Sequence, residues 1–176
     1  MIVLGVDPGS YYTGYSVFNS VHIHLDNKGL IDYGVIHAPN NASLSSRLHT
    51  IRDGLIELLN KHEIETVCLE SYFFHTNTAQ GKYILFVQGV ILEVLSMYPK
   101  IETYFVMPSE VKSTVTGYGK SKKQQIKECI EMIYGKIVDK TKFSDISKFD
   151  DIYDAIAIGH TFVYKKLISL HKLKEL

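Results

Sequence analysis

The stretch LGVDPGSYYTGYSV, residues 4–17, places a carboxylate at the end of an apolar run. Residues 2–7 predict a short buried strand whose last residue is Asp7. Pro8 and Gly9 follow at once and favour a tight turn, and residues 12–19 then predict a second strand. Because this turn is short, the two strands should form an antiparallel hairpin. Asp7 therefore lies at a strand tip, where it is either a turn residue or part of a functional site.

The remaining patterns predict one α/β domain that covers residues 1–176. We expect a third strand within 21–38, a helix over 44–62, a strand over 66–70, a helix over 78–97, a strand over 103–109 broken at Pro108, a short helical turn, a helix from near Ser121, and a last helix from Phe149. This order predicts a mixed five-stranded sheet, its first three strands antiparallel, with helices on its faces.

Composition narrows the class of protein. Of the 176 residues, 45% are hydrophobic and 22% are charged, as in a folded globular chain. The formal net charge is zero, but residues 1–80 carry −4 and residues 112–148 carry +5. An acidic region followed by a basic one suits a nuclease, and a solvated lysine face is the alternative. The sequence shows neither a signal peptide nor an apolar run long enough to span a membrane, so we expect a cytoplasmic protein.

Acidic residues gather at the ends of the predicted elements. Asp7 and Glu70 each end a strand, and these two strands should lie parallel and side by side, with their carboxyl ends adjacent. Asp151 and Asp154 are three residues apart and so share one face of the last helix. Asp150 stays open as a further member, because it precedes Asp154 by one helical turn. Acids that favour the positive end of a helix dipole are the alternative for the helical pair.

Four converging carboxylates repel one another and need a cation. Oxygen ligands select Mg²⁺ or Mn²⁺ over zinc. Two such ions, roughly 4 Å apart, can activate a water and stabilise the leaving oxygen in phosphodiester cleavage. The residue pattern therefore predicts a divalent-metal site, with two ions expected.

Four segments, in order, resemble the RuvC family of Holliday-junction resolvases, which have the RNase H-like fold. These segments are GVDPGSYYTGY at 5–15, CLE at 68–70, PSEVKSTVTGYGKSKKQQI at 108–126 and DIYDAIAIGH at 151–160. The resemblance covers most of the chain. It implies a homodimeric endonuclease that resolves four-way DNA junctions by paired symmetric nicks with metal-activated water. Lysine, isoleucine and tyrosine are abundant, which favours an AT-rich genome such as that of a phage, acting in the host cytoplasm, or a low-GC bacterium.

The resemblance also implies roles for individual residues. The metal ligands would be Asp7, Glu70, Asp151 and Asp154, and the DNA-contacting residues would be Phe73, Lys112, Lys122 and Lys123. Phe73 would stack on unpaired bases. The chain has only two arginines, so lysine point charges would supply the phosphate contacts.

The helix expected over 78–97 is apolar on more than one face, which predicts burial on two sides. One side would pack on the sheet, and a second copy of the chain would cover the other; an element of the same chain is the alternative. Other functions stay open: an RNase H-like nuclease acting on flaps, forks or RNA, a kinase-like phosphate site, or a junction-binding protein without activity.

Overall fold

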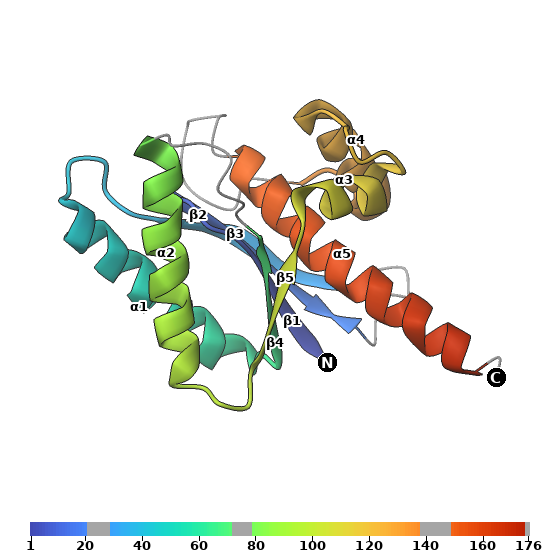
Figure 1. Ribbon diagram of the computed structural model, residues 1–176, viewed down its shortest axis with the longest axis horizontal. Coiled ribbons are helices and arrows are strands. Elements are labelled where there is room, and N and C mark those ends of the chain that lie inside the picture. The colour runs from blue at the N-terminus through green and yellow to red at the C-terminus, as the bar shows by residue number, and fades with distance from the viewer. Residues whose placement is uncertain (21–28, 72–78, 138–148, 175–176) are drawn as a thin grey trace.

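The computed structural model describes residues 1–20, 29–71, 79–137 and 149–174, and it has helices on both faces of one sheet (Figure 1). The elements in chain order are β1 (Ile2–Asp7), β2 (Tyr12–Asn19), β3 (Leu30–His37), α1 (Leu44–His62), β4 (Thr66–Glu70), α2 (Ala79–Ser96), β5 (Glu102–Val106), α3 (Pro108–Thr116), α4 (Lys123–Tyr134) and α5 (Phe149–Lys174).

The sheet has five strands in the order β3-β2-β1-β4-β5. Strands β1 and β2 are antiparallel, as are β2 and β3, whereas β4 pairs in parallel with both β1 and β5. The predicted hairpin and the predicted parallel pair are both confirmed. Strand β1 lies at the centre, so its tip is bordered by β2 on one side and by β4 on the other.

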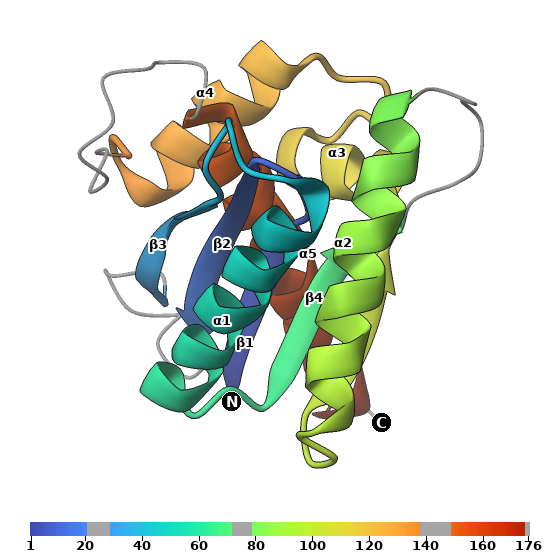
Figure 2. The ribbon, with the colours of Figure 1, turned by 90° about the vertical axis from the view of Figure 1, so that its left-hand side faces the viewer.

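Two hydrophobic clusters hold the layers together. Helices α1 and α2 cover one face of the sheet and α5 crosses the other, with α3 and α4 beside the first turns of α5 (Figures 1 and 2). Leu4, Ile51 and Ile91 belong to the first cluster, and Phe18 and Ile156 to the second; all five are fully buried. Each such side chain contributes about 1.5–3 kcal/mol by leaving water. The two cores therefore fix the helices that carry the site.

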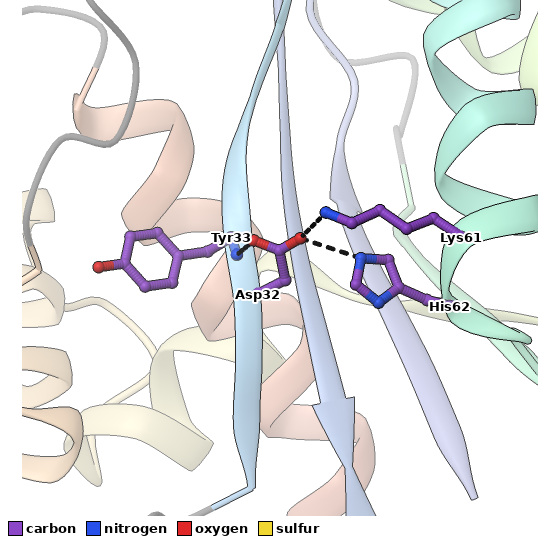
Figure 3. A network of polar contacts seen from close by, with 4 residues as sticks. All are labelled: Asp32, Tyr33, Lys61 and His62. Atoms are coloured by element: carbon purple, nitrogen blue, oxygen red, sulfur yellow. Dashed lines mark hydrogen bonds and ion pairs between the residues drawn. The ribbon is translucent and has the colours of Figure 1, made fainter.

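Polar contacts at the far end of α1 attach this helix to β3. Lys61 Nζ and His62 Nε2 lie 2.8 and 2.9 Å from Asp32 Oδ2 (Figure 3). The Asp32 carboxylate also accepts a hydrogen bond of 2.9 Å from the backbone N–H of Tyr33. These hydrogen bonds hold the pKa of Asp32 below its usual value, although partial burial opposes them. At the other end of the helix, Ser43 accepts a hydrogen bond from Ser46 N and so caps α1.

Two predictions about the segment after β4 need correction. Strand β5 ends at Val106 rather than near residue 109, and residues 108–116 form the helix α3 rather than a short turn. Pro108 begins this helix because its missing N–H needs no partner in a first turn. The buried Val111 and Val115, four residues apart, then attach α3 to the core. Phe73 and most of the lysine-rich stretch 135–149 lie outside the described residues.

Helix α2 exposes part of its apolar surface. Val87, Ile91 and Val94 are fully buried against the first core, whereas Phe86 is 50% exposed and Leu92 is 43% exposed. Burial of one side of the helix is therefore confirmed, and burial of the outer side by a second copy of the chain stays a prediction. No helix among the described residues is long and apolar enough to cross a membrane.

Candidate active site

The site begins with two neighbouring strand ends. Asp7 is the last residue of β1 and Glu70 the last residue of β4. Val6 pairs in parallel with Leu69, so the two acids occupy equivalent positions on adjacent strands. Gln88 of α2 donates a hydrogen bond of 2.9 Å from Nε2 to the carbonyl oxygen of Glu70 and fixes that strand end. Gln88 was not expected from the sequence, because a glutamine in an apolar helix carries no distinct signal.

Helix α5 brings the second pair of acids to the same place. Gly14, which pairs with Asp7 in the hairpin, lies so close to α5 that a Cβ there would be 2.0 Å from the carbonyl oxygen of Asp151. Ser16, two residues on, donates a hydrogen bond of 2.7 Å to the carbonyl oxygen of Ala155. Glycine and a small polar residue thus allow the helix backbone to rest directly on the strand. This contact sets Asp151 and Asp154 beside the tip of β1.

All four predicted acids line one cavity of about 710 Å³. Two of the predicted basic residues, Lys112 of α3 and Lys123 of α4, line it as well. Lys122 precedes α4, is exposed and does not line the cavity, and Asp150 is also exposed and outside the lining. The structure therefore distinguishes Lys123 from its neighbour, which the sequence alone did not.

Burial and mutual repulsion perturb the carboxyl groups. Burial raises the pKa of Asp7 well above its usual value, and Asp154, Asp151 and Glu70 raise it further. Burial, followed by the charge of Asp154, raises the pKa of Glu70 to about 7, and the same two causes raise the pKa of Asp151 to about 6. Burial and the neighbouring negative charges both disfavour the ionised form of these acids. The raised pKa values therefore indicate that the site holds too little positive charge.

One lysine compensates this charge in part. Lys123 Nζ lies 2.9 Å from Asp154 Oδ2, and among the described residues this is the one ion pair that the four acids make. Burial still raises the pKa of Asp154 despite this hydrogen bond. Burial opposes the charge on Lys123, but the hydrogen bond to Asp154 and the negative charges of Asp154, Asp7 and Asp150 together outweigh it and raise the pKa of the ammonium. The ammonium therefore pairs with one carboxylate, and in the described part of the chain the other three acids make no ion pair.

The donor set fits a hard divalent cation by its chemistry. It consists of carboxyl oxygens, which suit Mg²⁺ and Mn²⁺, and its repulsion is the kind that a cation relieves. In the arrangement seen, no three His, Cys, Asp or Glu side chains of the described residues form a closed ligand cluster. The acids share one cavity and would have to draw together around an ion.

Comparison with known proteins now identifies the family. The family model described as Crossover junction endodeoxyribonuclease RuvC matches residues 3–162. The protein of that name from Dictyoglomus thermophilum is 33% identical over 166 residues, which span 94% of this chain and 98% of the relative. The one from Alkaliphilus metalliredigens is 31% identical over 159 residues, 90% of each chain. These similarities give no support to the phage or low-GC origin suggested by residue usage.

The solved structures agree with this sequence similarity. T. thermophilus RuvC in complex with a Holliday junction substrate matches with a TM-score of 0.74 at 22% identity, over 95% of this chain and 96% of that chain. This similarity shows that the two chains share a fold. It confirms the RNase H-like arrangement that the sequence motifs implied. The chain belongs to the crossover junction endodeoxyribonuclease RuvC family and is a metal-dependent endonuclease.

Proposed function

We propose that this protein resolves four-way DNA junctions through paired symmetric nicks, and that Asp7, Glu70, Asp151 and Asp154 hold the divalent ions it uses. The observation that carries the proposal is the gathering of these four acids in one cavity with too little positive charge to balance them. Nucleases of this family use divalent metals. We expect Mg²⁺ or Mn²⁺, with two ions for each site, and a cytoplasmic location.

The chain's own residues hold the reacting groups in place. Two ions, when bound, would activate the attacking water and neutralise charge on the leaving oxygen. Asp7 and Glu70 lie on rigid strand ends, so they would anchor the ions. Asp151 and Asp154 would complete the site from α5, which is fixed by its close contact at Gly14. All four acids would act in their ionised form, so metal binding would release protons from the groups with raised pKa.

The lysines would hold the DNA backbone. Lys112 and Lys123 line the cavity beside the carboxylates, so they would contact phosphates next to the scissile bond. Lys123 would leave Asp154 for a phosphate once an ion neutralises that carboxylate. Lys122 is exposed at the start of α4 and would contact the backbone further out. Phe73 is proposed, from the family resemblance, as a contact to unpaired bases.

A homodimer would supply two sites for the two cuts. Two-fold symmetry of the protein would match the two-fold symmetry of the junction. The exposed apolar side chains of α2, Phe86 and Leu92, support an interface on this helix. Sedimentation should therefore show a dimer at micromolar concentration, and Phe86→Glu should shift it toward a monomer because it places a charge in that interface. A wild-type monomer at this concentration would contradict the interface.

The test of the function is cutting of synthetic DNA in Mg²⁺. We expect symmetric nicks in a four-way junction and much slower cutting of linear duplex, flap, fork and RNA substrates. Asp7→Asn should abolish cutting but keep junction binding, whereas Asp53→Asn, on the exposed surface of α1, should leave both unchanged. Cutting of flaps or RNA with an intact junction would refute the proposed substrate. Unchanged cutting by Asp7→Asn would remove this residue from the site.

A further inference from the structure

Arg47 in the first turns of α1 is a buried cation without a hydrogen-bonded partner for two of its donors. The residue is 5% exposed, and its Nε and Nη1 atoms find no acceptor among the described residues. Its guanidinium instead contacts two aromatic rings. The Cζ atom lies 3.9 Å from the ring centroid of Tyr11 and 5.6 Å from that of Tyr83. Attraction between the cation and the ring faces thus replaces the usual carboxylate partner.

A purely structural residue would not need this charge. Burying guanidinium donors such as Nε and Nη1 without hydrogen-bonding partners is unfavourable, and an apolar side chain of similar length would fill the space without that cost. The acids of the cavity do not explain the charge either, because the described ion pairs join Arg47 to none of them. The effect specific to the guanidinium is on the two rings, which it polarises and holds in position.

Both rings belong to the wall of the active-site cavity. Tyr11 and Tyr83 line it together with the carboxylates, and they are 41% and 37% exposed. The backbone of Tyr11 is held in the turn after β1, since its carbonyl oxygen accepts a hydrogen bond of 2.8 Å from Ala38 N. Tyr83 comes from α2 and Arg47 from α1, on the face of the sheet opposite α5 (Figure 2). The rings are therefore fixed from behind and accessible from the cavity.

The cavity has two chemically different walls. Lys112 and Lys123 come from α3 and α4, beside α5, and suit phosphates, whereas Tyr11 and Tyr83 offer aromatic surface from the other side. A nucleotide whose phosphate lies at the acids carries its base within reach of such a wall. Bases stack on aromatic side chains whatever their sequence, because every base has a π-face.

We propose that Tyr11 and Tyr83, held by Arg47 as a positioning residue, form a wall that stacks a nucleobase next to the cut phosphate. The proposal rests on the proposed function, since it places DNA in this cavity. It assigns the wall a contact at the metal site itself, distinct from the unpaired-base contact expected of Phe73. Arg47 would act through the rings and would not touch the DNA.

The test compares loss of the base with loss of the ring. After the cuts are mapped, junctions carrying one abasic nucleotide next to the cut are bound in EDTA and followed by fluorescence anisotropy. For the wild type, removing the stacked base should weaken binding by about 5- to 150-fold. In Tyr11→Ala the same abasic junction and the intact junction should bind nearly equally, because the partner of the base is gone. This double-mutant cycle isolates the stacking contact from general damage.

Matched variants separate the ring from its support. We call the loss of affinity caused by removing the base the abasic effect. Tyr11→Phe keeps the ring and should keep this effect. Tyr164→Ala, which changes an exposed tyrosine on α5 outside the cavity, should keep it too. Arg47→Met should melt at or above the wild-type temperature and yet show a reduced abasic effect, with partial recovery in Arg47→Lys. If the arginine variants do not fold, Tyr11→Ala and Tyr83→Ala, at partly exposed positions, still decide the question.

Equal abasic effects in the wild type and Tyr11→Ala would overturn the wall, as would a wild type that shows no abasic effect at any position next to the cut. Either result leaves the proposed function intact, provided that the wild type cuts the intact junction in Mg²⁺. A wild type that neither binds nor cuts the junction would instead overturn the proposed function, and the wall with it. The wild-type arm alone therefore distinguishes the two failures.

Discussion

Glu70→Gln should stabilise the metal-free protein at neutral pH while removing metal binding. The pKa of Glu70 is raised from 4.5 to about 7, chiefly by burial and then by Asp154. Between these two values the folded state binds more protons than the unfolded state, so the free energy of unfolding falls as pH rises. Above pH 7 the folded protein holds an ionised, poorly solvated carboxylate. Glutamine cannot ionise and therefore avoids this loss.

The magnitude follows from the size of the shift. Each pKa unit corresponds to about 1.4 kcal/mol, so the full difference is about 3 kcal/mol. The cavity opens to solvent, which screens the charges, and we therefore expect about 2 kcal/mol. The difference in unfolding free energy between Glu70→Gln and the wild type should be near zero below pH 4.5. It should grow through pH 5–7 and reach its full value near pH 8.

Urea unfolding in EDTA, at pH values from 4 to 8, measures this difference directly. Subtracting the wild type cancels the contributions of the titrating groups that do not interact with position 70. Asp7, whose pKa Glu70 helps to raise, adds to the difference in the same direction. Glu57→Gln, an exposed glutamate on α1, is the matched control and should show a difference near zero throughout. A difference that stays flat, or that falls as pH rises, would refute the assignment of a buried and repelled carboxyl group at position 70.

Adding Mg²⁺ at pH 8 should reverse the order of stability. A ligand that binds only the folded state contributes about 2.7 kcal/mol at a concentration 100 times its dissociation constant. The wild type should gain stability in Mg²⁺ and lose it again in EDTA, whereas Glu70→Gln should change little. Equal gains in both proteins would show that Glu70 is not a ligand, even if its raised pKa were confirmed.

Two further substitutions test the lysine and the helix contact. Lys123→Ala removes the partner of Asp154 and, with it, the proposed phosphate contact. It should weaken junction binding and lower the steepness of the plot of log affinity against log salt concentration by about one. An unchanged slope would mean that Lys123 does not contact phosphate. Gly14→Ala places a methyl group 2.0 Å from the Asp151 carbonyl oxygen. Urea unfolding should show that the free energy of unfolding falls by about 1–3 kcal/mol, and the variant should cut more slowly. An unchanged free energy of unfolding would contradict the close approach of α5.

Much of the site could be predicted because its signals are local. The apolar runs before Asp7 and Glu70 are short, and each ends directly in an acid, which is visible without any knowledge of the fold. The parallel pairing of their strands followed from the helix between them, since a parallel connection needs such a crossover. The spacing of Asp151 and Asp154 fixed their common face in the same way.

Other features depended on partners far away in the chain. A glycine inside a strand, such as Gly14, is typical of a place where another backbone comes close, but the sequence does not show which one. That backbone is the carbonyl of Asp151, more than a hundred residues later. The sequence predicts only a short helical turn where α3 forms. Nine residues are marginal as an isolated helix, and burial of Val111 and Val115 in the core beside α5 supplies the missing stability. Arg47 lies in an amphipathic helix, where nothing local shows that Tyr11 and Tyr83 bury it.

The close contact between α5 and Gly14 explains why the fold tolerates a site whose acids repel one another. Repulsion among the buried carboxylates acts to separate β1, β4 and α5. If α5 moved away, it would lose its backbone contact with Gly14 and the buried hydrogen bond that Ser16 donates to it. Hydrophobic burial along α5 therefore holds the charges together before any ion binds. A pre-formed, repelling set of acids gains more from a cation than a relaxed one does, so the stability lost in the metal-free protein should be recovered as metal affinity.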